Sequence, residues 1–281
     1  MKIIVTTDST SDISNEFQKK YEISVMPLTV NLGNDEFLDG KTITNEDIFE
    51  FVEKKNILPK TAARSPQQYK EFFEEAIKLY NADKVIHISL SSELSSSYQN
   101  AKLATEGDDR VEVIDSLSLS SGSGLLVLSA VDKIKQGKTF EEIVGLIKEE
   151  VNKVQASFIL NDLRYLYKGG RCSALSVLGA NILRIKPKIK LVDGKMGVDK
   201  KYMGKLETVI DKYVDDLLND HPNPIKNRVF VTYTSTTDNI NNSIKTRLEE
   251  KGFKEIIFNT AGSTIASHCG KNCLGVLFID N

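Results

Sequence analysis

The sequence predicts an α/β protein of two α/β domains, and two observations support this. Through roughly the first 158 residues, apolar segments of strand length alternate with amphipathic segments of helix length, which favours a parallel sheet covered by helices. After that point the order changes to helices, a hairpin and further strands, which favours a second, mixed sheet. We therefore predict an N-terminal domain of residues 1–158 and a C-terminal domain of residues 159–281.

Each expected strand of the N-terminal domain is followed by an expected helix. Thr44 is placed to cap one helix, and Ser65 followed by proline is a strong start for the next. The expected strands are 3–9, 23–32, 84–90 and 111–116, and the expected helices are 12–21, 44–55, 65–80, one from about Leu94, 117–136 and 139–154.

The C-terminal domain is expected to begin with helices and a hairpin. Residues 161–198 indicate a helix, a Gly-rich turn, a second helix and a hairpin whose turn is Asp193-Gly194. A helix over 203–220 and strands over 228–235, 254–259 and 274–280 complete this unit.

Composition narrows the class of protein. Apolar residues make up 40% of the 281 residues, enough for a core, and the net charge of −2 comes with no basic block for nucleic acid or a charged membrane surface. The longest apolar stretch, near residues 124–134, is far too short to span a bilayer, so we expect no stable membrane insertion. Three cysteines form no disulfide framework, and a cytoplasmic location is expected.

Polar residues gather where expected strands end. Asp8-Ser9-Thr10, the six serines within residues 87–101, and Asp115-Ser116 all lie at such ends, where α/β sheets bind ligands. Their hydroxyls and amides suit a carboxylate or a phosphate. Ordinary helix capping is the alternative, but it accounts for only about two of the six serines.

Two further segments carry candidate binding residues. In LYKGGRCS (166–173), the glycines allow close backbone approach and Arg171 can pair with an oxyanion, although a helix end followed by a surface arginine is the more common outcome. In ASHCGKNCLG (266–275), His268 suits a hydrogen bond to a carboxylate. A metal site of His268 with Cys269, Cys273 and Cys172 is the less favoured alternative, because no second cysteine pair has metal-ligand spacing.

The other histidines and the common catalytic motifs give no further site. His87 lies within an apolar strand and is expected to be a core residue, and His221 lies in a polar loop. The GxSxG, Walker, GxGxxG and HExxH patterns are missing. No catalytic residue can be named from spacing.

Several segments form an ordered set over nearly the whole chain: TTDSTSDI, PKTAARSP, SSELSSSYQNA, VIDSLSLSSGSGLL, NILRIKPKIKLVDGKM and HCGKNCLGVLF. Together they resemble the DegV family of bacterial fatty-acid-binding proteins. Each is weakly specific, but the ordered set is strong. The resemblance implies two α/β domains that enclose a long-chain fatty acid, no other cofactor, and a carrier that presents the lipid to a separate fatty acid kinase for acyl phosphate formation in phospholipid synthesis.

By position in these motifs, the resemblance also implies site residues. Thr61 and Ser95 match residues that bond the carboxylate, His268 matches a histidine near that headgroup, and Arg171 matches an arginine of headgroup or kinase-docking role. Ser96 is taken as a further ligand-binding residue beside Ser95.

The chain departs from the family pattern at three places. TAARSP stands for the usual TSQPSP, which places Ala62 and Arg64 there; Ser96 replaces a usual glycine; and HCGKN replaces HxGPG. The headgroup site is therefore expected to differ in shape or preference. A stand-alone phosphotransferase or hydrolase acting on a small acyl or phosphorylated substrate is the alternative function, and a structural or regulatory protein that retains the fold is a third.

Overall fold

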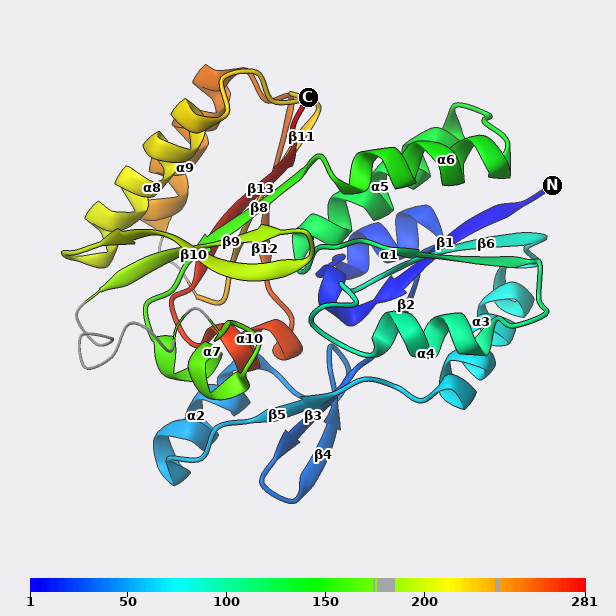
Figure 1. Cartoon of the computed structure of the whole chain (residues 1–281), viewed down its shortest axis with the longest axis horizontal. Coiled ribbons are helices and arrows are strands. Elements are labelled where there is room, and N and C mark those ends of the chain that lie inside the picture. Colours follow the sequence, from blue (N-terminus) through cyan, green and yellow to red (C-terminus); the bar gives the residue numbers. More distant parts are fainter. Residues whose placement is uncertain (174, 176–184, 236–237) are drawn as a thin grey trace.

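The N-terminal part of the chain forms a parallel sheet, as predicted. The computed structural model describes residues 1–173, 175, 185–235 and 238–281. Four parallel strands lie in the order β2-β1-β6-β7 (Figure 1). They are β1 (Ile3–Asp8), β2 (Ser24–Met26), β6 (Lys84–Ser89) and β7 (Val111–Asp115). The helical segments of this part are η1 (Ser9–Ser11), α1 (Asn15–Tyr21), α3 (Pro66–Tyr80), α4 (Ser97–Ala104), α5 (Ser121–Lys135) and α6 (Phe140–Val151).

The C-terminal part of the chain forms a mixed sheet of six strands. Its order is β10-β9-β8-β13-β11-β12, with only the β11–β12 pair parallel. The strands are β8 (Val154–Ile159), β9 (Lys186–Val192), β10 (Lys195–Tyr202), β11 (Arg228–Tyr233), β12 (Glu255–Thr260) and β13 (Leu274–Ile279). The helices are α7 (Leu163–Gly169), α8 (Leu206–Asp220), α9 (Asp238–Lys251) and α10 (Ser263–Cys269). The second helix expected within 161–198 lies outside the described residues.

The limits of the sheets differ from the expected domain limits at β8. This strand pairs with β13 and β9, so a division by sheets falls before Val154, whereas the predicted boundary after residue 158 lies within the strand. The sequence analysis placed residue 154 at the end of a helix and missed the strand that follows it.

A small third sheet was not expected. It has the order β4-β3-β5, with β3 (Thr29–Leu32), β4 (Asp35–Leu38) and β5 (Lys60–Ala62). Helix α2 (Asn45–Lys55) lies between β4 and β5 in the chain. The single strand predicted over 23–32 is therefore wrong, because β2 and β3 belong to different sheets. Pro27 stands between them and has no N–H for a ladder hydrogen bond, so the chain leaves one sheet and enters the other there.

Helix α5 is buried almost throughout and contacts both large sheets. Its first residues, SGSGLLVL, are all buried, and the helix contacts β1 and β6 as well as β8, β11 and β13 (Figure 1). Added Cβ atoms at Gly122 and Gly124 would lie 2.2 Å from Ser118 Oγ and 2.7 Å from the Ser11 carbonyl oxygen. These glycines therefore permit close packing.

Candidate ligand-binding site

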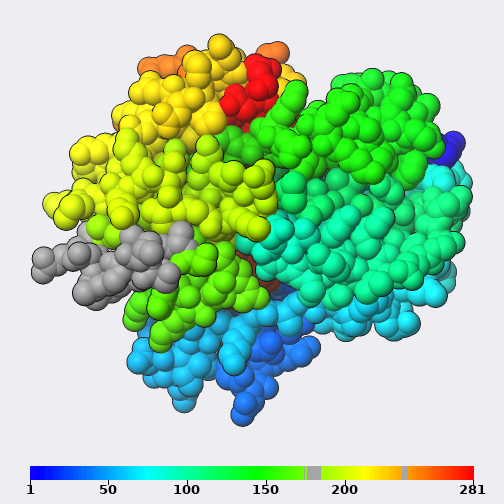
Figure 2. Space-filling model, in the orientation of Figure 1, coloured from blue at the N-terminus to red at the C-terminus, as the bar shows by residue number. Residues whose placement is uncertain are grey.

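A cavity lies where the three sheets meet. It has about 560 Å³ of empty space, part of it open to solvent. We call it the outer cavity. Figure 2 shows a hollow on this face between the green α7 segment and the blue-green α4 segment. Its lining is mostly apolar, with polar groups from Thr10, Thr61, Ser95, Arg171, Thr264 and His268.

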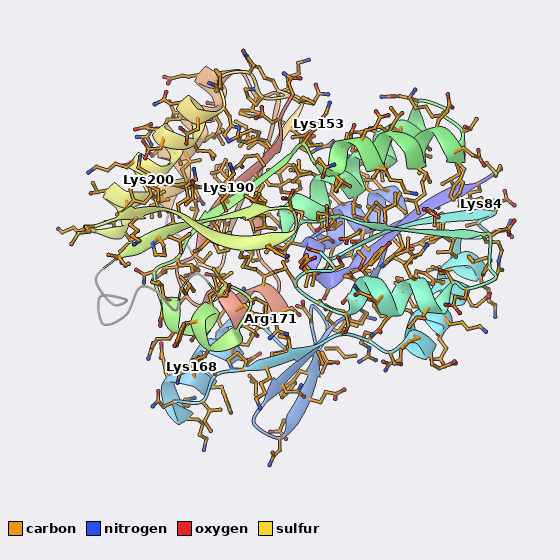
Figure 3. All side chains as sticks on the ribbon, in the orientation of Figure 1. Lys84, Lys153, Lys168, Arg171, Lys190 and Lys200 are labelled. Atoms are coloured by element: carbon orange, nitrogen blue, oxygen red, sulfur yellow. The ribbon has the colours of Figure 1, made fainter. Side chains whose placement is uncertain are left out.

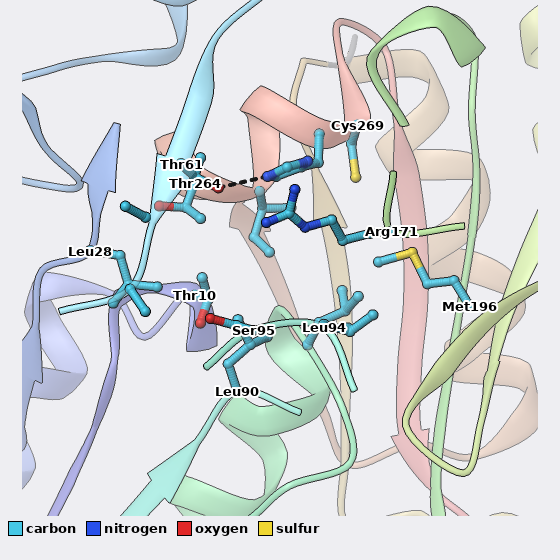
Figure 4. A pocket seen from close by; sticks show the side chains of 15 residues that line it. Thr10, Leu28, Thr61, Leu90, Leu94, Ser95, Arg171, Met196, Thr264 and Cys269 are labelled. Carbon is cyan, nitrogen blue, oxygen red and sulfur yellow. Dashed lines mark hydrogen bonds between the residues drawn. The ribbon is translucent and has the colours of Figure 1, made fainter. Parts of the chain in front are cut away.

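Thr61 and His268 form the central polar pair of the outer cavity. Thr61 Oγ1 lies 2.8 Å from His268 Nε2, although the residues are 207 positions apart in sequence (Figure 4). Thr61 comes from β5, and His268 comes from α10. The other ring nitrogen, Nδ1, is buried without a hydrogen-bond partner.

Gly169 explains the position of the imidazole. A Cβ at this residue would lie 2.6 Å from His268 Nδ1, so only glycine lets the end of α7 approach the ring. The next residue, Gly170, has φ +72° and ends the helix. The two glycines of LYKGGRCS thus serve a histidine and a helix end, and not the direct approach to a ligand that the sequence suggested.

His268 is neutral at physiological pH. Burial, and then the nearby positive charge of Arg171, lower the pKa of His268 to about 4. Figure 4 shows the Arg171 side chain among the residues that line the outer cavity, and Figure 3 places this side chain next to α7 and α10. Arg171 is exposed and donates from Nη1 to the Gly169 carbonyl oxygen at 2.6 Å. Its remaining donors are available to an anion at the cavity mouth.

Ser95 and Thr10 supply hydroxyls on the opposite side of the outer cavity (Figure 4). Ser95 Oγ accepts a hydrogen bond from the Ser97 amide at 3.2 Å and lies 3.0 Å from Ser97 Oγ, so it also braces the start of α4. The Thr10 hydroxyl is buried without a partner. An unpartnered buried hydroxyl is costly unless a ligand or water satisfies it.

Ser96 and Arg64 do not line the outer cavity. Ser96 is exposed, so the residue that replaces a usual glycine faces solvent. Arg64 donates from Nη1 to Thr29 Oγ1 at 3.0 Å, while Ala62 is part of the lining.

Thr264 is a lining residue that the sequence analysis missed. It lies four residues before His268 on α10, and its buried hydroxyl has no partner. Only a prediction of the short helix over Ser263–Cys269 would have placed it on the same face as His268.

Two buried carboxylates fix the start of α10. The Gly262 amide donates to Asp12 Oδ1 at 2.8 Å, and the Ser263 amide donates to Asp39 Oδ1 at 2.7 Å. Burial raises the pKa of Asp12 to about 8, and the charge of Asp39 adds to that effect. Asp12 also accepts from the Ser120 hydroxyl. The helix that carries His268 is thus held by residues from distant parts of the chain.

Most of the other strand-end residues have structural roles. Asp8 accepts from Tyr69 Oη, Ser89 Oγ and the Leu90 amide. Burial acts to raise the pKa of Asp8, but the nearby His87 imidazole, whose Nε2 lies 3.6 Å from Asp8 Oδ1, and the hydrogen bonds from Tyr69 and the Leu90 amide lower it overall. His87 is fully buried, as expected of a core residue. Asp115 accepts from the backbone of the serine-rich turn, and Ser91 Oγ donates to the Gly194 carbonyl oxygen.

A second, inner cavity adjoins the outer one. It has about 310 Å³ of empty space and shares Leu119, Ile265 and Cys269 with the outer cavity. The rest of its lining includes residues of the six-stranded sheet: Phe158, Thr232, Tyr233, Gly275 and Leu277. Ser121 Oγ lies 2.6 Å from Thr232 Oγ1 and Thr234 Oγ1 donates to the Gly270 carbonyl oxygen, so these threonine hydroxyls are already paired.

The described residues contain no group of three potential metal ligands. Cys269 and Cys273 lie at the inner cavity, whereas the Cys172 thiol donates to the Met196 carbonyl oxygen. In the same described ranges, no helix combines the length and apolar character needed to cross a bilayer.

Fold and site together define a class of α/β proteins. In this class, a mostly apolar cavity that carries a few polar groups lies where the sheets meet. The model of the family described as "uncharacterised protein, DegV family" matches residues 2–281. The chain is 33% identical to a DegV domain-containing protein of Caldanaerobacter subterraneus, over 99% of this chain and 98% of the relative. A Clostridium perfringens relative is also 33% identical, over 99% of both chains. The protein therefore belongs to the DegV family.

Solved structures of the family have the same fold. A Thermus thermophilus DegV family protein, described by its fatty acid binding, superposes with a TM-score of 0.90 at 26% identity over 100% of both chains. DegV of Bacillus subtilis, described as a fatty acid binding protein, gives a TM-score of 0.86 at 26% identity, also over 100% of both chains.

Proposed function

We propose that this protein binds one long-chain fatty acid and presents its carboxylate to a separate fatty acid kinase. The observation that carries the proposal is the Thr61–His268 pair in a cavity whose lining is mostly apolar. The fatty-acid-binding descriptions of two structures with the same fold support the choice of ligand.

The carboxylate would lie among Thr61, Ser95 and Arg171. With the imidazole proton on Nε2, His268 donates to Thr61 Oγ1, which leaves the threonine hydroxyl hydrogen for the ligand. This tautomer also leaves Nδ1 as an unprotonated atom against Gly169, where no acceptor is available. His268 is therefore a positioning residue that sets the direction in which Thr61 donates.

The acyl chain would run from the outer into the inner cavity past Leu119, Ile265 and Cys269. Burial of each methylene contributes about 0.8 kcal/mol, so a chain of about sixteen carbons supplies most of the gross driving force. Each charge-assisted hydrogen bond adds about 1.5–3 kcal/mol and fixes which end faces outward. Arg171 at the mouth keeps the carboxylate at the surface, where a kinase can reach it.

Ligand binding is tested on the purified full chain. We expect native mass spectrometry to give a fatty-acid adduct, organic extraction to release the lipid, and added oleate to raise the melting temperature of stripped protein. Repeatedly empty preparations together with an unchanged melting temperature would contradict the proposal.

The carrier role needs a separate test. We expect the chain with ATP and oleate to form no acyl phosphate, and a fatty acid kinase to form it only when this chain is added. Turnover by the isolated chain would favour the stand-alone enzyme instead.

A further inference from the structure

Cys269 and Cys273 both line the inner cavity. Cys269 is the last residue of α10, Cys273 directly precedes β13, and both are buried. Between them, Gly270 and Asn272 have φ values of +70° and +61°, which turn the chain back so that both thiols line one cavity.

The turn is held in this shape from β11. Thr234 Oγ1 donates to the Gly270 carbonyl oxygen at 2.7 Å and accepts from the Cys273 amide at 3.0 Å. Both sulfurs lie at this one turn against the inner cavity, and the Cys269 thiol is close enough to raise the pKa of the Cys273 thiol. Two thiols that flank one closed turn and line one cavity can be brought to the S–S distance of about 2.05 Å by a local movement of that turn.

The two thiols differ in access. Cys269 lines the outer cavity, whose lining includes the exposed Arg171, as well as the inner one, whereas Cys273 lines only the inner cavity. A small peroxide therefore meets Cys269 first. The Cys269 contact and burial raise the pKa of the Cys273 thiol, which makes Cys273 a poor first nucleophile.

We propose that Cys269 and Cys273 are an oxidative modification site, at which a peroxide converts the two thiols to a reversible disulfide and thereby weakens ligand binding. The Cys269 thiolate attacks a peroxide oxygen, the O–O bond breaks, and a sulfenic acid forms. The Cys273 sulfur then attacks the Cys269 sulfur and water leaves. Overall, two thiols and hydrogen peroxide give one disulfide and two waters, and the sulfurs lose the two electrons that the peroxide gains.

The effect on the ligand rests on the proposed function. Cys269 is adjacent to His268, so drawing its sulfur onto Cys273 pulls the last turn of α10 and moves the imidazole away from Thr61. A bound acyl chain, in turn, fills the route by which peroxide reaches Cys269. These effects are two sides of one linkage, since an oxidation that weakens ligand binding is itself opposed by the ligand.

Disulfide formation is tested without reference to lipid. Stripped full-length protein is treated with hydrogen peroxide, denatured, alkylated and digested with trypsin, which cuts after Lys271 between the two cysteines. We expect a pair of peptides joined until reduction and an intact-mass loss of about 2 Da. Cys172→Ser is the matched control and should still form the bond. Full alkylation of both cysteines, or a bond to Cys172, overturns the proposal.

The order of attack is tested with single variants. Cys273→Ser should accumulate a sulfenic acid at Cys269 that dimedone traps, whereas Cys269→Ser should give no adduct at Cys273. Equal trapping in both variants overturns the assignment of Cys269 as the thiol attacked first.

The coupling is tested by titrating oleate into reduced and oxidised protein. We expect about tenfold weaker binding after oxidation, restored by dithiothreitol, and slower disulfide formation in loaded protein. Equal oleate affinity of the two forms overturns the coupling. If neither form binds oleate while the disulfide forms, the proposed function fails and the modification site stands.

Discussion

Thr61→Val is the most direct test of the headgroup site. Valine has nearly the shape of threonine and suits a strand, so β5 is expected to remain paired with β3. The change removes only the hydroxyl that lies 2.8 Å from His268 Nε2. Any loss of binding can therefore be attributed to one polar atom.

The expected magnitude follows from the bonds that this hydroxyl makes. Loss of one charge-assisted bond to the carboxylate costs about 1.5–3 kcal/mol, which corresponds to roughly 10- to 150-fold weaker binding. The variant also leaves His268 Nε2 without its partner, which costs about 1–3 kcal/mol of folding stability. The empty protein should therefore melt a few degrees lower.

The assay is calorimetric titration of oleate into stripped protein, with thermal unfolding of the same samples. Thr61→Ser retains the hydroxyl and should bind within a few-fold of the unchanged protein. If Thr61→Val binds oleate as tightly as Thr61→Ser, the hydroxyl does not hold the carboxylate and the headgroup assignment is refuted.

Three further changes test neighbouring parts of the site. Ser95→Ala should weaken oleate binding about tenfold, whereas Ser96→Ala, at an exposed position outside the cavity lining, should leave it unchanged; equal effects in titration would contradict the distinction between them. Gly169→Ala should weaken binding and lower the melting temperature because its Cβ meets His268 Nδ1, while Gly197→Ala, which meets nothing within 4 Å, is the control. The pKa of Asp12 is raised from 3.8 in a free chain to about 8 in the fold, so between these pH values the folded state holds a proton that the unfolded state has lost. The free energy of unfolding should therefore fall with rising pH across that window, by at most about 1.4 kcal/mol per pH unit. Asp12→Asn should flatten this dependence in denaturant unfolding at pH 6 to 8, and an unchanged slope would show that Asp12 does not cause it.

The alternating pattern and the capping residues predicted much of the fold, because they are local signals. The capping boxes of Thr44 with Asp47 and of Ser65 with Gln68 begin α2 and α3 where expected. Helix α10 escaped prediction because it has seven residues and its first amides are bound by Asp12 and Asp39, which are far away in sequence. The short strand β5 escaped for a similar reason, since three residues give no periodic pattern.

The candidate site was only partly accessible to sequence reasoning. Resemblance indicated Thr61, Ser95, Arg171 and His268, and the structure brings all four to one cavity. Ser96 was taken as a further binding residue beside Ser95, but it is exposed, because neighbouring residues at a helix start point in different directions. The unpartnered hydroxyl of Thr264 could be recognised only once the surroundings of α10 were known.

The long sequence separation of Thr61 and His268 also bears on how the protein is made. Their 207-residue separation means that the proposed carboxylate end of the cavity does not exist until the chain has been synthesised past α10. A nascent chain that has folded only its parallel sheet presents Ser95 but has no Thr61–His268 pair. The protein is thus expected to leave the ribosome empty and to acquire its lipid as a finished fold.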